Sequence, residues 1–205
     1  MNDLDVLINR KVTFHCSRRG GEKGKKDFKV VHSLSEPLST DQIPDWVTPS
    51  LLAIYKRWNG LKLFQPGAEV DEGFKLFSLD EVSVELNELR EIIKENIDLY
   101  EENSDFKDLD LWLNGLIPIA EIMSSGNKFA LDTYHKDETG ECPIVYLNHE
   151  AYYGDVCDPS VAKVKAINAN DLLKRILNEP LKYLASGWVG GNYKEQWYPD
   201  SMSYA

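Results

Sequence analysis

The spacing of apolar residues predicts one helix in the first half of the chain and another near its end. Thr48 is placed to cap a first helix, which we expect to close at Asn59-Gly60 because glycine can adopt a left-handed conformation. A last helix is expected to begin at Asn170 or Asp171, whose side chains suit an N-cap position. The apolar positions at helical spacing are Leu51, Ile54, Tyr55 and Trp58 in the first helix and Leu172, Leu173, Ile176 and Leu177 in the last.

The clearest helical pattern lies between these two, over Asp80–Glu102. Ser78 and Glu81 form a capping-box pattern just before it. Apolar side chains recur on one face of this helix and carboxylates fill the opposite face. The apolar positions are Val82, Leu86, Leu89, Ile93, Ile97 and Tyr100, and the acidic positions are Glu81, Glu85, Glu88, Glu91, Glu95, Asp98 and Glu102.

Short alternating runs predict β-strands. A β-hairpin is expected over residues 10–33, with a glycine-rich basic tip, and residues 33–49 read as a proline-containing connector. The tail, residues 188–205, is rich in aromatic residues and has no clear periodicity. A short strand is expected at residues 73–77, and three further runs separated by turn residues indicate an antiparallel central sheet, at residues 116–120, 128–132 and 143–147.

Charge is unevenly distributed along the chain, whose net charge is −11. Residues 80–110 contain twelve acidic and three basic side chains, a net charge of −9, whereas residues 10–29 contain eight basic and two acidic side chains, a net charge of +6. This balance argues against nucleic-acid binding, which needs clustered Lys and Arg, and favours a basic protein partner. Because the chain shows neither a signal-peptide pattern nor a membrane-span run, we expect it in the cytoplasm.

Cysteine and histidine side chains do not form a recognisable metal motif. Cys16, Cys142 and Cys157 are odd in number and lack a CxxC spacing, so we expect free thiols. A site built from His135, Cys142, His149 and Cys157 would have gaps of seven or eight residues, longer than the two to five typical of structural zinc. We therefore predict no metal site and no cofactor.

Catalytic motifs are also missing from the sequence. Cys16 is the best-placed nucleophile, because His15 adjoins it and Arg18 and Arg19 follow. Adjacent side chains of a strand point to opposite faces, however, so His15 is badly placed to activate Cys16. We predict no catalytic residues and a protein that is not an enzyme.

Five short motifs follow one another in a fixed order and resemble the SUKH superfamily, which includes fungal cell-wall-synthesis regulators and many bacterial immunity proteins. The resemblance covers about residues 44–178 of a chain that we expect to form one domain over residues 1–205. It implies an α+β fold, with helices around a mainly antiparallel sheet, and function by binding. The motifs span residues 55–60, 73–82, 116–120, 126–132 and 148–150.

Most residues of these motifs have a structural interpretation, as core anchors, helix ends and turns. Asn127 stands where the family often has an acidic residue, and the hairpin, the long acidic helix and the aromatic tail exceed the family pattern. The motif residues that we single out are Trp58, Asn59, Gly60, Gly73, Phe74, Gly126 and Asp132.

The resemblance and the charge pattern together predict an immunity protein that binds and neutralises a basic toxin domain, for which a nuclease is one candidate. The acidic face of the long helix would meet this partner, although a charged helix face is also commonly just a solvated surface. The alternatives are a regulatory scaffold and, third, an enzyme of unrecognised type. The predicted partner-binding residues are Glu88, Glu91, Glu95, Asp98 and Glu102.

Overall fold

The chain forms an antiparallel β-sheet that carries helices on both of its faces. The structure is a computed structural model, and it describes residues 3–18, 24–66, 72–95, 111–123, 125–149, 163–184 and 197–204. Within these residues nine strands pair in the order β8-β7-β6-β5-β4-β3-β2-β1-β9, and every neighbouring pair is antiparallel. The strands are β1 (Val12–Arg18), β2 (Lys25–Leu34), β3 (Leu61–Gln65), β4 (Gly73–Leu76), β5 (Leu116–Met123), β6 (Lys128–Asp132), β7 (Ile144–Leu147), β8 (Lys163–Ala166) and β9 (Trp197–Tyr204).

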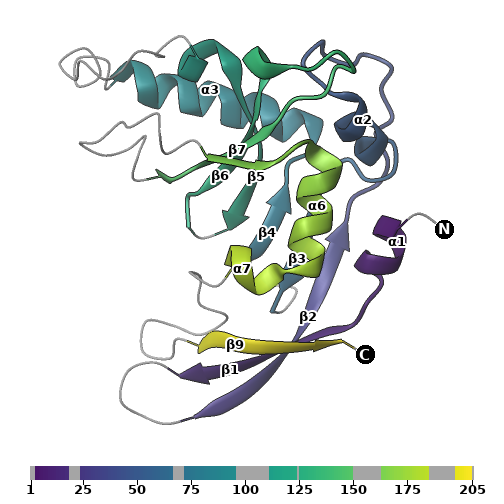
Figure 1. The fold of residues 1–205 in the computed structure, drawn as a ribbon, viewed down its shortest axis with the longest axis vertical. Helices are drawn as coiled ribbons and strands as arrows, with labels where there is room; N and C mark the ends of the chain where they lie inside the picture. The colour runs from purple at the N-terminus through teal and green to yellow at the C-terminus, as the bar shows by residue number, and fades with distance from the viewer. Residues whose placement is uncertain are drawn as a thin grey trace.

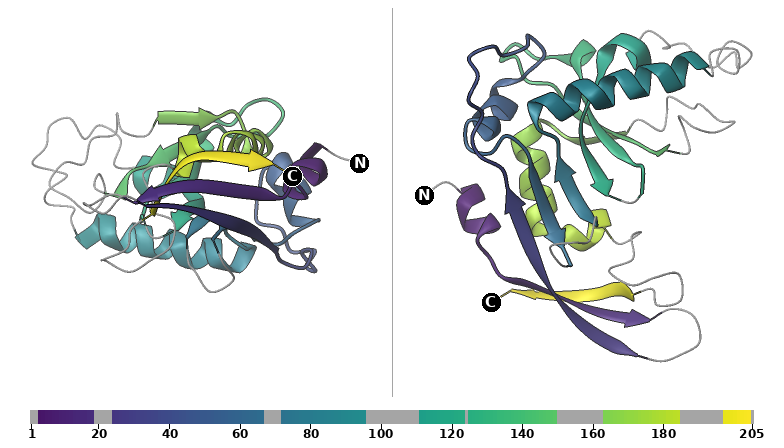
Figure 2. Two further views of the ribbon diagram at one scale, coloured as in Figure 1. Left: turned by 90° about the horizontal axis from the view of Figure 1, so that it is seen from below. Right: turned by 180° about the vertical axis from the view of Figure 1, so that it is seen from behind.

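The two longest described helices lie on opposite faces of the sheet. Figures 1 and 2 show α3 (Leu79–Glu95) behind the strands and α6 (Ala169–Asn178), continued by α7 (Pro180–Leu184), in front of them. Two shorter helices, α1 (Asp3–Ile8) and α2 (Pro49–Tyr55), lie beside α6. A π-helical turn, η1 (Leu111–Gly115), precedes β5, and a 3₁₀ turn, η2 (Thr133–His135), follows β6. The α+β class predicted from the sequence is confirmed.

Alternation along the central strands divides the core into two layers. On β6, Ala130 faces α3, where it packs with Leu89 and Ile93 of that helix. Its neighbours Phe129 and Leu131 point to the other face, where the apolar side of α6 covers them. The apolar side chains of α6 are fully buried, which explains why this helix is so strongly amphipathic. They are Leu172, Leu173, Ile176 and Leu177.

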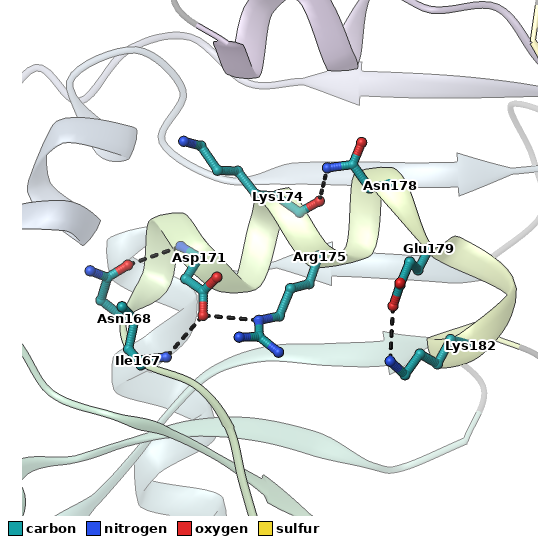
Figure 3. A network of polar contacts seen from close by, with 8 residues as sticks. All are labelled: Ile167, Asn168, Asp171, Lys174, Arg175, Asn178, Glu179 and Lys182. Atoms are coloured by element: carbon teal, nitrogen blue, oxygen red, sulfur yellow. Dashed lines mark hydrogen bonds and ion pairs between the residues drawn. The ribbon is translucent and has the colours of Figure 1, made fainter.

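The outward side of α6 is held by local polar contacts rather than by packing. Asn168 caps the helix, since its side-chain oxygen accepts a hydrogen bond from the Asp171 N–H at 2.9 Å (Figure 3). Asp171 in turn pairs with Arg175 at 2.9 Å, and Glu179 pairs with Lys182 at 2.9 Å. The predicted cap at Asn170 or Asp171 is therefore wrong by two or three residues, because the asparagine that precedes Ala169 has the extended backbone that a cap needs.

The predicted hairpin is present and belongs to a larger structure. Strands β1 and β2 pair over Val12–Ser17 and Lys25–Val30, and β9 adds a third strand on the outer side of β1. In Figures 1 and 2 this three-stranded unit, here called the arm, lies at the opposite end of the long axis from α3. The hairpin tip, residues 19–23, lies outside the described residues.

Several elements differ from the sequence prediction. The helix predicted to close at Asn59-Gly60 ends at Tyr55, although the Trp58 N–H still bonds to the Ile54 carbonyl at 2.8 Å. Strand β2 continues to Leu34, so the connector begins two residues later than expected. The second helix is described only to Glu95, and its predicted continuation to Glu102 lies outside the described residues. The sequence did not predict α1, α7, β3, β8 or β9.

Candidate protein-binding surface

The start of α3 is fixed by two independent hydrogen-bonding groups. Ser78 and Glu81 form the predicted capping box, with the Glu81 carboxylate accepting from the Ser78 N–H at 2.8 Å and the Ser78 hydroxyl accepting from the Glu81 N–H at 3.3 Å. The next free N–H, that of Leu79, donates to the Asn59 side-chain oxygen at 2.9 Å. The motif residue Asn59 therefore ties α2 to the beginning of α3.

Two of the three acidic residues nearest this start, Glu81 and Glu85, are neutralised within the molecule, whereas Asp80 is exposed. Lys75 of β4 pairs with Glu81 at 2.8 Å, and Lys128 of β6 pairs with Glu85. Burial raises the pKa of Glu81, but the hydrogen bonds from Lys75 and Ser78 outweigh it, so this pKa lies below its ordinary value. Burial alone would lower the pKa of Lys75, yet its bond to Glu81 raises it. These two carboxylates belong to the fold rather than to a free surface.

The next three carboxylates of α3 point away from the sheet. Glu88, Glu91 and Glu95 are exposed, and no ion pair reaches them within the described residues. We call these three residues the acidic stripe. Val84 lies on the same side of the helix, because it and the three glutamates follow one another at spacings of four, three and four residues. Val84 is 65% exposed. The acidic stripe thus starts beside an apolar side chain in contact with solvent.

The far end of the described helix is anchored to η1. The Arg90 guanidinium donates from Nε to the Leu113 carbonyl at 2.8 Å, which uses one of the two basic side chains on this helix. The other, Lys94, is exposed. The remaining predicted partner-binding residues, Asp98 and Glu102, lie outside the described residues.

The family-motif residues occupy the junctions of the fold. Trp58 packs against the core with the Arg57 guanidinium 4.2 Å from its ring centroid, and Phe74 is completely buried. Gly60 and Gly126 have positive φ angles of 101° and 71°, and a side chain at either would crowd a neighbouring element. Asp132 is buried and accepts from the Tyr134 N–H at 3.2 Å.

The residues considered for metal binding are dispersed. His135 pairs with Asp132 at 2.7 Å, whereas His149 contacts a different residue, its Nδ1 lying 3.0 Å from the Asn127 side-chain oxygen, an acceptor. Cys142 is buried in the core, where burial raises the pKa of its thiol, and Cys157 lies outside the described residues. In the part of the chain that the structure describes, His, Cys, Asp and Glu side chains form no group of three that could hold a metal ion.

Cys16 and His15 point to opposite faces of β1, as the sequence predicts. Cys16 is 2% exposed, and burial raises the pKa of its thiol to about 11, with Asp200 and Asp27 adding to the effect. His15 lies on the solvent side of the arm, where Nδ1 contacts Asp27 at 2.8 Å and Nε2 contacts the Ser203 hydroxyl at 3.0 Å. Ser203, His15 and Asp27 are the residue types of a hydrolase triad. They lie on an open sheet face, however, where His15 and Asp27 are 41% and 66% exposed.

A hollow of about 240 Å³ lies where α1, α2 and the start of α6 meet. Leu4 and Ile54 supply apolar lining, and Arg57, Asn168 and Asn170 supply polar groups. This site was not predicted from the sequence. Arg57 lies more than 100 positions before Asn168 and Asn170 in the chain, and no spacing in the sequence connects them.

Two comparisons bear on the identity of the chain. A family model described as the SMI1 / KNR4 family (SUKH-1) matches residues 48–163. A search of curated proteins found no match. The matched region contains β3 to β7 and α3, and it excludes the strands of the arm. No helix among the described residues is long and apolar enough to cross a membrane.

Proposed function

The chain belongs to the SMI1 / KNR4 (SUKH-1) family, and from that premise we propose that it is a non-catalytic immunity protein that binds and neutralises a bacterial toxin domain. The family match covers more than half of the chain and is consistent with function through protein binding. The partner, its basic character and the cytoplasmic location of the complex are parts of the same proposal.

The observation that carries the proposed interface is the acidic stripe. Glu88, Glu91 and Glu95 are exposed on a helix whose half-buried acidic residues, Glu81 and Glu85, are neutralised by lysines of the sheet. Carboxylates that are not satisfied internally attract a cationic surface, and a basic toxin that binds a polyanionic substrate presents such a surface. Val84 supplies an apolar contact at one end of this row.

The proposed activity is tested by co-expression. A test bacterium expresses the gene next to the one that encodes this chain, with and without the protein, and growth is recorded. Relief of toxicity supports the immunity function. Toxicity without relief contradicts it, and recovery of several host proteins on the immobilised chain would then favour the regulatory scaffold.

The interface is tested separately, with the purified toxin whose effect the protein relieves. The variant E88K/E91K/E95K changes the net charge by +6, and so does the control E36K/D41K/E138K, whose three acidic residues are exposed elsewhere. We expect the first variant to slow association by about ten- to a hundredfold at low salt, and the control to slow it much less. Stopped-flow association at two salt concentrations measures this difference. Equal rates for the two variants would exclude the acidic stripe as the interface.

A further inference from the structure

The outer face of the arm carries two lysines that have no acidic partner. On β2, Phe28 and Val30 pack against the core. Side chains alternate along a strand, so Lys25, Lys29 and Val31 lie on the opposite, outer side. Both lysines are exposed, and no ion pair reaches them within the described residues. Their charges are therefore open to a group from outside the molecule.

The acidic residue between these lysines is engaged by another side chain. Asp27, the one acidic residue of β2, contacts Nδ1 of His15 on the neighbouring strand at 2.8 Å. Val31, at the other end of the outer face from Lys25, is 42% exposed. We call Lys25, Lys29 and Val31 the lysine row. The lysine row thus combines two cationic side chains with an apolar end.

The lysine row has the same layout as the acidic stripe with its neighbour Val84, but with the opposite charge. Each has a valine in contact with solvent at one end and charged side chains beyond it. The eleven residues from Val84 to Glu95 span about 17 Å of helix. The six residues from Val31 to Lys25 span about 20 Å of strand. The two lengths match, so the valines can meet while the glutamates meet the lysines.

The placement of the two elements allows this contact between two copies of the chain. In Figure 1 the C-terminal end of α3 and the start of β2 lie on the same side of the molecule, at opposite ends of its long axis. Figure 2, left, looks along that axis: no described helix lies over the outer face of the arm, and β2 is the strand of the arm nearest to α3. A copy displaced along the long axis without rotation therefore brings its lysine row over the acidic stripe, with matching ends together.

We propose that the lysine row binds the acidic stripe of a second copy of this chain, head to tail. The contact joins two different surfaces, so each copy keeps one of them for a further copy and the assembly grows as a chain. The net charge of −11 opposes association at long range, but at 0.1 M salt the Debye length is about 10 Å, and charges in contact are screened less than distant ones. The contact stands without the proposed function, although a toxin bound to the acidic stripe would exclude the second copy.

Charge reversal tests the contact by sedimentation velocity of the full chain, with no toxin present. The wild-type protein should sediment faster as its concentration rises to about 0.5 mM in 0.1 M salt, and as a monomer in 0.5 M salt. E88K/E91K/E95K and K25E/K29E should each stay monomeric, because like charges then face each other. An equimolar mixture of the two should associate again, since the reversed stripe of one meets the reversed row of the other. A monomeric wild type, or a mixture that stays monomeric, would overturn the proposal.

Two control variants separate the contact from a general effect of charge. E36K/D41K/E138K and K56E/K136E change the net charge by the same amounts as the two test variants, at exposed positions outside α3 and the arm. Both controls should associate as the wild type does, and a loss equal to that of the test variants would contradict the contact. Both test variants keep a negative net charge, so general attraction does not explain association of their mixture. Circular dichroism checks that all four variants fold, and failure of this test leaves toxin binding undecided.

Discussion

At the residue scale, the most unusual backbone position belongs to a buried aromatic residue. Phe64 has a φ angle of 60°, a conformation that bulky side chains rarely adopt, and is 2% exposed. Its N–H, turned out of the regular ladder, donates to Nδ1 of His32 at 3.0 Å. The two rings also meet edge to face, with centroids 4.9 Å apart. The neutral form of His32 is thus part of the junction between β2 and β3.

This contact predicts a pH-dependent stability. Burial lowers the pKa of His32 below its ordinary value, and protonation would remove the lone pair that Phe64 uses. The stabilisation is therefore present above about pH 6.5 and is lost as the pH falls through the lower pKa of the folded state. Urea unfolding at pH 7.5 and 5.5 measures it. The variant H32N keeps an acceptor that does not titrate, and a pH dependence equal to that of the wild type would contradict the assignment.

Gly73 is the glycine that the fold can least replace. Its φ is 106°, and a Cβ there would lie 2.3 Å from the Leu63 carbonyl oxygen of the paired strand. Gly140 also has a positive φ, of 82°, but its Cβ would meet only Pro49, at 3.8 Å. We expect G140A to cost about 1–2 kcal/mol of unfolding free energy and G73A to cost more than about 3 kcal/mol. Chemical denaturation of both variants tests this, and equal losses would contradict the steric explanation.

At the element scale, α2 depends on a carboxylate from a distant turn. Thr48 and Pro49 begin this helix as predicted, and Glu141, 91 positions from Ser50, accepts from the Ser50 N–H at 2.7 Å. Asp137 holds that turn by accepting from the Thr139 N–H at 2.8 Å and from the Glu141 N–H at 3.0 Å. The cap therefore belongs to two segments that meet only in the folded protein.

Removing this cap should destabilise the protein without altering its surface charge pattern elsewhere. We expect E141A to lower the unfolding free energy by about 1–2 kcal/mol, since it removes two charge-assisted hydrogen bonds at a helix start. E138A, three residues earlier at an exposed position, removes the same charge and should have little effect. Urea denaturation compares the two. Similar losses in both variants would assign the effect to net charge instead.

Elements with a local signal were predictable, and those that depend on distant partners were not. Periodicity and caps identified α2, α3 and α6, and alternating runs identified β5, β6 and β7. Strand β3 was missed because four of its five residues are buried, which removes the alternation. Strand β9 contains Pro199 and Asp200 and becomes a strand only by pairing with β1, about 180 residues away. The hollow at Arg57 was missed for the same reason.

At the scale of the whole molecule, charge is separated along the long axis. The acidic stripe lies at the end formed by α3, and the lysines of β2 lie in the arm at the other end (Figures 1 and 2). The sequence predicted the two charged segments, but their placement at opposite ends follows from the order of strands in the sheet. The acidic stripe thus lies away from the lysines of the arm.

The arm needs its last strand to be complete. Met202 of β9 packs against the core, as do Phe28 and Val30 of β2, beside the buried Val12 and Phe14 of β1. Removal of residues 197–205 should leave an open β1 edge, lower the unfolding free energy by at least about 2 kcal/mol and promote association. Urea unfolding and analytical ultracentrifugation measure these effects, with removal of Ala205 alone as the control. A monomeric, equally stable shortened chain would show that β9 is dispensable.

The pairing of β1 with β9 also sets a waiting time during synthesis. The hairpin of β1 and β2 is complete once Leu34 has been made, but the ribosome must add about 160 further residues before Trp197. At roughly 5–20 residues per second this takes on the order of ten to thirty seconds. Throughout that interval one side of the nascent hairpin has unpaired backbone groups. Chaperones that recognise extended chain therefore have their longest opportunity at the first strand of this protein.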